Sequence, residues 1–217
     1  MNMPAGDWPK LSLPETEGGY LQKAYGQAQI ILEYGSGGST VFAAQQPGKL
    51  IFSVESDREW ALSLQRQFDE ASLPSPAVLY HVDIGETGAW GRARDDSAWR
   101  HYYRYPTAIW SEPFFRQPDL VLIDGRFRAA CFVNTCLRTR KPVTIVFDDY
   151  KDRNIYHCVE QLQKPDEMVG RMAVFHVQPQ EWPDWANDFL LELCTHVTFS
   201  ADKVDYNYSM DFPFIKK

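Results

Sequence analysis

The chain has 217 residues, of which 44% are hydrophobic and 14% aromatic, so it has enough apolar side chains for a sizeable core and is not disordered throughout. This length suits one domain, because single hydrophobic cores divide only beyond roughly 250–300 residues. The 22 Lys and Arg residues stand against 29 Asp and Glu, for a net charge of −7. We therefore expect no nucleic-acid partner, because nucleic acid attracts clustered positive charge.

Residues 1–19 are rich in Pro, Gly and acids and are predicted to form a flexible arm, followed by one domain over 20–217. No apolar signal region is visible, and the longest apolar runs are about 4–6 residues, against the ~20 that a membrane helix needs. We therefore expect a cytoplasmic protein with no membrane partner. The four cysteines lack CxxC spacing and are expected to be buried free thiols.

Along the rest of the chain, short apolar runs alternate with helical patterns. Continuous apolar runs are typical of strands buried on both faces of a parallel sheet. The helix after the second strand is predicted to have Ser56 as its N-cap, and the helix after the fifth strand Asp152. The alternation predicts a doubly wound α/β sheet. Its strands are predicted at 30–32, 50–54, 77–82, 120–123, 143–147, 171–177 and 188–199, and its helices at 20–28, 40–46, 56–68, 129–137 and 155–162.

One segment, residues 84–118, interrupts this alternation with interleaved aromatic and arginine side chains. Loops of this length inside a compact domain are usually functional, and aromatic faces with guanidinium groups suit an anionic, sugar-like or aromatic substrate. We predict that the segment covers the substrate; an apolar cluster or the interface of a homodimer is the alternative. His101 in this segment is the histidine to test as a general base. The arginines of the segment are Arg92, Arg94, Arg100, Arg104 and Arg116.

Each predicted parallel strand is followed by a carboxylate. In an open parallel sheet, ligands bind beyond the carboxyl ends of the strands, so these acids are expected at the rim of a ligand site. A single acid in a loop would mean little, but acids after five successive strands indicate a functional edge. The residues are Glu33, Glu55, Asp83, Asp124 and the pair Asp148-Asp149.

The loop after the first strand contains the sequence Gly35-Ser36-Gly37-Gly38. Glycines let backbone N–H groups approach a ligand closely. A dinucleotide-binding G-x-G-x-x-G motif would need a glycine where Thr40 stands, and a P-loop would need a lysine. The sequence E-x-G-x-G-G that starts at Glu33 instead resembles the first motif of class I S-adenosylmethionine-dependent methyltransferases.

This resemblance covers roughly residues 30–150 and implies a Rossmann-like sheet of seven strands, mostly parallel with an antiparallel last strand. It implies that S-adenosylmethionine contacts Glu33 and the loop Gly35, Ser36, Gly37 and Gly38. Glu55 lies at the end of the second predicted strand, the position from which a carboxylate binds both ribose hydroxyls. Asp83 resembles the residue that meets the adenine amino group, and Ile84 next to it is expected in the same pocket. A helix N-terminal acid and an exposed loop acid remain the alternative interpretations of Glu55 and Asp83.

The ends of the fourth and fifth predicted strands, LVLIDG and IVFDD, resemble the metal-dependent small-molecule O-methyltransferases, such as catechol O-methyltransferase. The resemblance implies a Mg²⁺ site on Asp124, Asp148 and Asp149, where the ion would lower the pKa of a substrate hydroxyl. Two residues depart from that family: Asp149 replaces an asparagine, and Phe127 replaces the lysine base. The flanking Arg126 and Arg128 stay protonated and are poor bases. A metal-free role for Asp148 or Asp149 with the substrate, or capping of helix N-termini, stays open.

We therefore predict an enzyme that moves the methyl group of S-adenosylmethionine to an oxygen, or less favourably a nitrogen, of a small-molecule or glycan acceptor. Positioning of the methyl group and the nucleophile in line would supply most of the catalysis. An NAD-dependent oxidoreductase on a related sheet is the first alternative, disfavoured by Thr40. A non-catalytic methyltransferase-like binding module is the second, and Phe127 in place of a base keeps it open.

Overall fold

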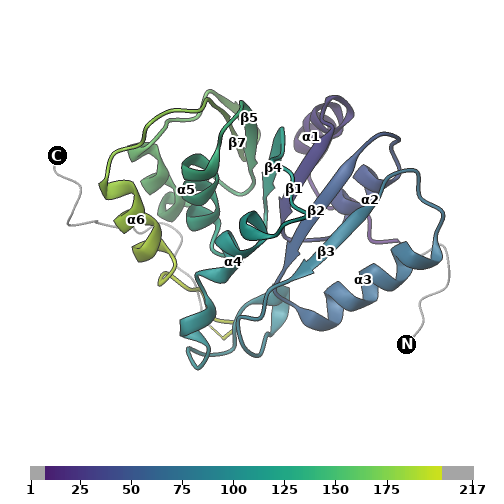
Figure 1. Ribbon diagram of the computed structural model, residues 1–217, viewed down its shortest axis with the longest axis horizontal. Coiled ribbons are helices and arrows are strands. Elements are labelled where there is room, and N and C mark those ends of the chain that lie inside the picture. Colours follow the sequence, from purple (N-terminus) through teal and green to yellow (C-terminus); the bar gives the residue numbers. More distant parts are fainter. Residues whose placement is uncertain (1–7, 202–217) are drawn as a thin grey trace.

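The computed structural model describes residues 8–201, whose apolar runs form one seven-stranded sheet (Figure 1). The strand order is β3-β2-β1-β4-β5-β7-β6, and β7 is antiparallel to both of its neighbours. The sheet is therefore the Rossmann-like, mostly parallel sheet that the sequence predicts. The strands are β1 (Ile30–Tyr34), β2 (Leu50–Glu55), β3 (Ala77–His81), β4 (Leu120–Ile123), β5 (Val143–Phe147), β6 (Glu167–Val169) and β7 (Met172–Val177).

Two helical layers cover the faces of the sheet (Figure 1). Successive residues of each strand point to opposite faces, so Ile31 packs in the core below α1, α2 and α3, and Leu32 in the core with α5 and α6. Among residues 8–201, no helix is both long enough and apolar enough to cross a membrane. The helices are α1 (Glu15–Gln27), α2 (Gly38–Ala44), α3 (Arg58–Glu70), α4 (Arg104–Thr107), α5 (Arg128–Arg138) and α6 (Trp185–Leu193).

The last part of the chain differs from the predicted secondary structure. Residues 188–199 were expected to form a strand, but α6 covers the first half of this segment. The spacing explains the error: Phe189 and Leu193, four residues apart, are buried on one helix face, while Leu191 is 64% exposed. The seventh strand is instead the short β6, which a tight turn at Gly170 (φ 58°) joins to β7.

The helix starts also differ from the predictions. Asp57, not Ser56, is the N-cap of α3, and its carboxylate accepts a hydrogen bond of 3.0 Å from the Trp60 N–H. The helix predicted after Asp152 is a 3₁₀ helix that begins at Asn154 without a side-chain cap. Helix α1 begins at Glu15, so the end of the predicted arm is helical, and the first seven residues of that arm lie outside the described part of the chain.

The aromatic segment 84–118 is part of the main core. It forms α4 and three 3₁₀ turns, Ala89–Gly91, Trp99–His101 and Ala108–Ser111. Tyr105 and Ile109 are fully buried, and the Trp110 indole donates a hydrogen bond of 2.8 Å to the hydroxyl of Tyr34 in β1. The segment therefore builds a fixed wall beyond the carboxyl ends of β1 and β4.

Candidate cofactor and acceptor site

A cavity of about 780 Å³ opens beyond the carboxyl ends of β1, β2, β4 and β5. It lies where the strand order reverses between β1 and β4, the place where open α/β sheets bind ligands. The predicted site residues that line it are Gly35, Ser36, Gly37, Gly38, Glu55, Asp124, Asp148 and Asp149. Three other predicted residues, Glu33, Asp83 and Ile84, are not among its lining residues.

The glycine loop forms one wall of the cavity, and its glycines serve different purposes. Gly35 has a φ of 100°, and a Cβ there would lie 2.9 Å from the Cα of Gly125. Gly37 is extended, and a Cβ there would meet no atom within 4 Å. Thr40, at the position of the missing third glycine, accepts a hydrogen bond of 3.0 Å from the Gly37 N–H and closes the loop onto α2. The loop is therefore fixed to α2 on one side, and at Gly37 its other side has space for a ligand.

The two strand-end glutamates have different environments. Glu33 is fully buried and accepts hydrogen bonds from Tyr25 Oη, at 2.7 Å, and from Thr40 Oγ1. Burial raises the pKa of Glu33, while these hydrogen bonds oppose the rise. Glu33 thus joins α1 and α2 to β1 and does not face the cavity. Glu55 does line the cavity, and its Oε2 accepts a hydrogen bond of 2.8 Å from Ser36 Oγ.

The end of the third strand does not reach the cavity. Asp83 is exposed and accepts a hydrogen bond of 2.9 Å from the Gly85 N–H, and Ile84 is buried in the core. His101, the candidate base, lies with its Nδ1 4.0 Å from Asp83 and is not a lining residue either.

Two tryptophans, Trp60 and Trp90, line the cavity. Trp90 belongs to the 84–118 segment that was predicted to cover the substrate, whereas the sequence analysis assigned Trp60 to no site. Trp90 is 84% exposed and has a φ of 64°, which is uncommon for a bulky side chain. The Trp60 indole donates a hydrogen bond of 3.0 Å to the Ser36 carbonyl. The available signal was the placement of Trp90 between Gly88 and Gly91, because glycines permit such a turn.

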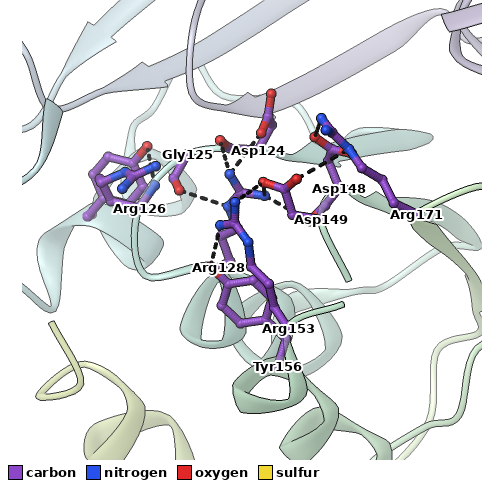
Figure 2. Close-up of polar contacts among 10 residues, drawn as sticks. Asp124, Gly125, Arg126, Arg128, Asp148, Asp149, Arg153, Tyr156 and Arg171 are labelled. Atoms are coloured by element: carbon purple, nitrogen blue, oxygen red, sulfur yellow. Dashed lines mark hydrogen bonds and ion pairs between the residues drawn. The ribbon is translucent and has the colours of Figure 1, made fainter. Parts of the chain in front are cut away.

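The three aspartates at the ends of β4 and β5 converge, with one ligand oxygen from each within 4.8 Å of the others. Asp149 has a φ of 56°, a conformation that Asp and Asn tolerate better than most residues. Arg128 is buried among them: its Nη2 lies 2.9 Å from Asp124 Oδ1, and its Nη1 lies 3.1 Å from Asp149 Oδ2 (Figure 2).

Two further arginines complete this cluster (Figure 2). Arg171, in the turn between β6 and β7, binds both oxygens of Asp148, with Nε at 2.9 Å and Nη2 at 2.7 Å. Arg153 Nη2 lies 2.7 Å from Asp149 Oδ2. Three guanidinium groups therefore neutralise three carboxylates. We refer to these six residues as the Arg–Asp cluster.

The Arg–Asp cluster does not fit Mg²⁺. A magnesium ion needs carboxylate oxygens in a near-octahedral shell, but both oxygens of Asp148 and both of Asp149 already face guanidinium nitrogens. Because the three carboxylates are already balanced by three guanidinium groups, the cluster also offers a divalent cation no net negative charge. The sequence-based expectation of a metal site is therefore not supported. Arg128 and Arg153 each follow an aspartate of the cluster by four residues, and Arg171 reaches it from the β6–β7 turn.

Asp124 differs from the other two acids. Removal from bulk water raises its pKa to about 6, with Arg128 opposing the rise and Asp148 and Asp149 adding to it. Its side chain is still 41% exposed and lines the cavity. A carboxylate with this pKa accepts a proton near neutral pH, so Asp124 is the candidate base of the site.

The residue at the position of the family's lysine base is structural. Phe127 has a φ of 49°, and its ring packs 5.3 Å from the ring of Tyr102 and 5.7 Å from that of Tyr105. It therefore wedges the 84–118 segment against the start of α5.

The cations of the cavity come mainly from outside the 84–118 segment. Only Arg92 of its five arginines is a lining residue, whereas Arg94 pairs with Glu86 at 3.4 Å. The other lining arginines are Arg126, Arg128, Arg153 and Arg171. Of the arginines of the segment, the structure therefore places only Arg92 at the cavity.

Comparison with known proteins gives a near relative among the solved structures. A methyltransferase-like protein from Silicibacter pomeroyi, of known crystal structure, is 44% identical, with a TM-score of 0.82 over 87% of this chain and 98% of that one. An O-methyltransferase from Bacillus cereus in complex with S-adenosylhomocysteine is 20% identical, with a TM-score of 0.47 over 67% and 61% of the two chains. An O-methyltransferase from Streptomyces achromogenes in complex with S-adenosylmethionine is 20% identical, with a TM-score of 0.44 over 72% and 63%. No protein-family model and no curated protein matches the sequence.

Proposed function

The chain belongs to the class I S-adenosylmethionine-dependent methyltransferase superfamily, and from this premise we propose that its cavity binds S-adenosylmethionine and transfers the methyl group to an acceptor. The acceptor atom is an oxygen, or less favourably a nitrogen, of a small molecule or carbohydrate. The observation that carries the proposal is the glycine loop opposite Glu55 at the switch point of the sheet, on the wall of one cavity.

The cofactor end of the cavity is assigned to the glycine loop. The open face of Gly37 accepts a ligand without steric conflict. Glu55 is held by the N–H groups of Ser56 and Asp57, at 2.7 and 2.9 Å to its Oε1. Within residues 8–201, its Oε2 accepts hydrogen bonds only from the N–H and the hydroxyl of Ser36. Ribose hydroxyls would donate charge-assisted hydrogen bonds to the same carboxylate, and one of them would replace the Ser36 hydroxyl on Oε2. Trp90, at the mouth, supplies an aromatic face for the adenine.

The residues of the acceptor end hold and deprotonate the nucleophile. When bound, S-adenosylmethionine supplies an electrophilic methyl group. Asp124 accepts the proton of the acceptor hydroxyl, and Arg128 fixes the Asp124 carboxylate through the 2.9 Å ion pair. The ion pairs of the Arg–Asp cluster also keep Asp148 and Asp149 in place. Alignment of the nucleophile with the methyl group is then the main contribution of the protein to the rate.

The direct experiment is calorimetric titration of the protein with S-adenosylhomocysteine and, separately, with NAD. Binding of S-adenosylhomocysteine and not of NAD supports the proposal, and the reverse would overturn it in favour of an oxidoreductase. Binding without transfer of a labelled methyl group to any member of an acceptor panel would favour the non-catalytic module. Asp124→Asn should leave the affinity for S-adenosylhomocysteine unchanged in the calorimetric titration and should abolish transfer of the labelled methyl group.

A further inference from the structure

We propose that Arg126 is an anion-binding residue of the acceptor site, so that the methyl acceptor carries a carboxylate or phosphate group. The inference rests on the proposed function, because it names the class of substrate for the same cavity. It starts from a difference between Arg126 and the arginines of the Arg–Asp cluster.

Those three arginines each face a carboxylate, and Arg126 does not. Within residues 8–201, its guanidinium makes no hydrogen bond or ion pair, and its Nε is buried without an acceptor. Figure 2 shows the side chain to one side of the ion pairs that join Arg128, Arg153 and Arg171 to the acids. A buried donor without a partner is rare in folded proteins and calls for a reason.

The surroundings of Arg126 make this cation costly without a ligand. Burial lowers the pKa of Arg126, and the charges of Arg128 and Arg92 lower it further. The polar groups that oppose this effect are the hydroxyls of Tyr105 and Tyr156. A half-buried guanidinium that faces like charge gains most from an anion brought by a ligand.

Its position suits an acceptor. Arg126 follows Gly125, which packs on the glycine loop, and lies two residues after the candidate base Asp124. Its backbone N–H donates a hydrogen bond of 3.3 Å to Tyr105 Oη, which ties the start of the side chain to the fixed wall. The planar fork of a guanidinium matches carboxylate and phosphate oxygens, so an anion there would orient the rest of the molecule toward Asp124.

The charge of the cavity agrees with an anionic ligand. Its lining holds six basic and five acidic side chains, although acids outnumber bases by seven in the whole chain. Three of the acids are neutralised by three of the bases in the Arg–Asp cluster. The rest of the lining then holds three basic side chains, Lys10, Arg92 and Arg126, against two acidic ones, Glu55 and Asp57.

The test compares thermal unfolding in sodium phosphate, sodium acetate and sodium chloride at equal ionic strength. We expect phosphate or acetate to raise the melting temperature of the wild-type protein above its value in chloride, with the stronger anion identifying the preferred group. The increment should be lost in Arg126→Gln and kept in part in Arg126→Lys. The matched control is Arg138→Gln, an exposed arginine at the last residue of α5, the helix that begins two residues after Arg126; this variant should keep the full increment. In chloride, Arg126→Gln should unfold at the same or a higher temperature, since it removes repulsion.

An equal increment in the wild type and in Arg126→Gln would overturn the proposal. A second assay measures the affinity of Arg126→Gln for S-adenosylhomocysteine and for 5′-methylthioadenosine, which lacks the carboxylate. If Arg126→Gln lost affinity for S-adenosylhomocysteine but not for 5′-methylthioadenosine, the proposal would also be overturned, because Arg126 would then bind the carboxylate of the cofactor. Unchanged affinity for both supports it. Failure of the wild type to bind S-adenosylhomocysteine would contradict the proposed function, whereas the anion titration of the cofactor-free protein tests Arg126 separately.

Discussion

Gly35 and Gly125 pack backbone against backbone where β1 and β4 end, so that a Cβ on Gly35 would lie 2.9 Å from the Cα of Gly125. Through this contact, the loop assigned to the cofactor touches the loop that carries Asp124 and Arg126. The separation of the two ligand ends of the cavity is therefore set by a contact that only glycine permits, and the first prediction follows from it.

Gly35→Ala should lower the free energy of unfolding by about 1–3 kcal/mol, because it adds a clash with backbone at a left-handed residue. Gly37→Val is the matched change in the same loop. Its extended backbone and open surroundings should keep the stability within about 0.5 kcal/mol, while the side chain blocks S-adenosylhomocysteine. Urea unfolding and calorimetry measure the two effects. Equal loss of stability in both variants would contradict this division of roles.

The two strand-end glutamates should also separate stability from binding. Glu55→Ala should weaken binding of S-adenosylhomocysteine by about 1–3 kcal/mol, because it removes a charged acceptor from the cavity. Glu33→Ala should leave the affinity of the folded protein unchanged and cost about 2 kcal/mol of stability, since the hydroxyls of Tyr25 and Thr40 lose their acceptor. Calorimetry on both variants below their unfolding temperatures distinguishes them. A binding defect confined to Glu33→Ala would reverse the assignment.

Some of this site was predictable from local sequence, and some was not. Periodicity and the glycine run located the carboxyl edge of the sheet, because strands and tight turns leave short-range signals. The Arg–Asp cluster left only a partial signal. Arg128 and Arg153 each lie four residues after an aspartate with which they pair, but the third arginine is distant in sequence. Arg171 is 22 residues beyond Asp149 and reaches the site only because the β6–β7 turn folds back beside β5. Glu33 was assigned to the cofactor because position in a motif does not reveal which way a buried side chain points.

The Arg–Asp cluster yields a third prediction. Millimolar Mg²⁺ or Mn²⁺ should leave the melting temperature of chelator-treated protein unchanged, because the carboxylates are already neutralised. Arg171→Ala should destabilise the fold by about 3–5 kcal/mol, since Asp148 is 1% exposed and would be left buried without its partner. A double variant with Asp148→Asn should recover part of that loss. A metal-dependent rise in the melting temperature of the wild type, together with metal-dependent methyl transfer, would restore the metal hypothesis.

The last prediction concerns pH and Asp124. Its pKa is about 6 in the folded protein, above the ordinary value of 3.8. Folding therefore favours the protonated form of Asp124. The stability that this protonation adds is fully present below pH ~4 and is lost as the pH rises through ~6. Asp124→Asn keeps a neutral group at every pH, so it should be more stable than the wild type at pH 7.5 and nearly equal at pH 4. Because the side chain is 41% exposed, solvent screening should reduce the full linkage to about 1 kcal/mol.

Urea unfolding of the two proteins at pH 4 and pH 7.5 measures this difference, in which titrations common to both cancel. Asp83→Asn, at an exposed strand-end acid outside the cavity, is the control and should differ from the wild type by less than about 0.5 kcal/mol at both values. The same ionisation predicts that methyl transfer by the wild type rises with pH through about 6, because the unprotonated Asp124 carboxylate is the base. A stability difference that stays constant between pH 4 and 7.5, or transfer by Asp124→Asn at the wild-type rate, would remove Asp124 from that role.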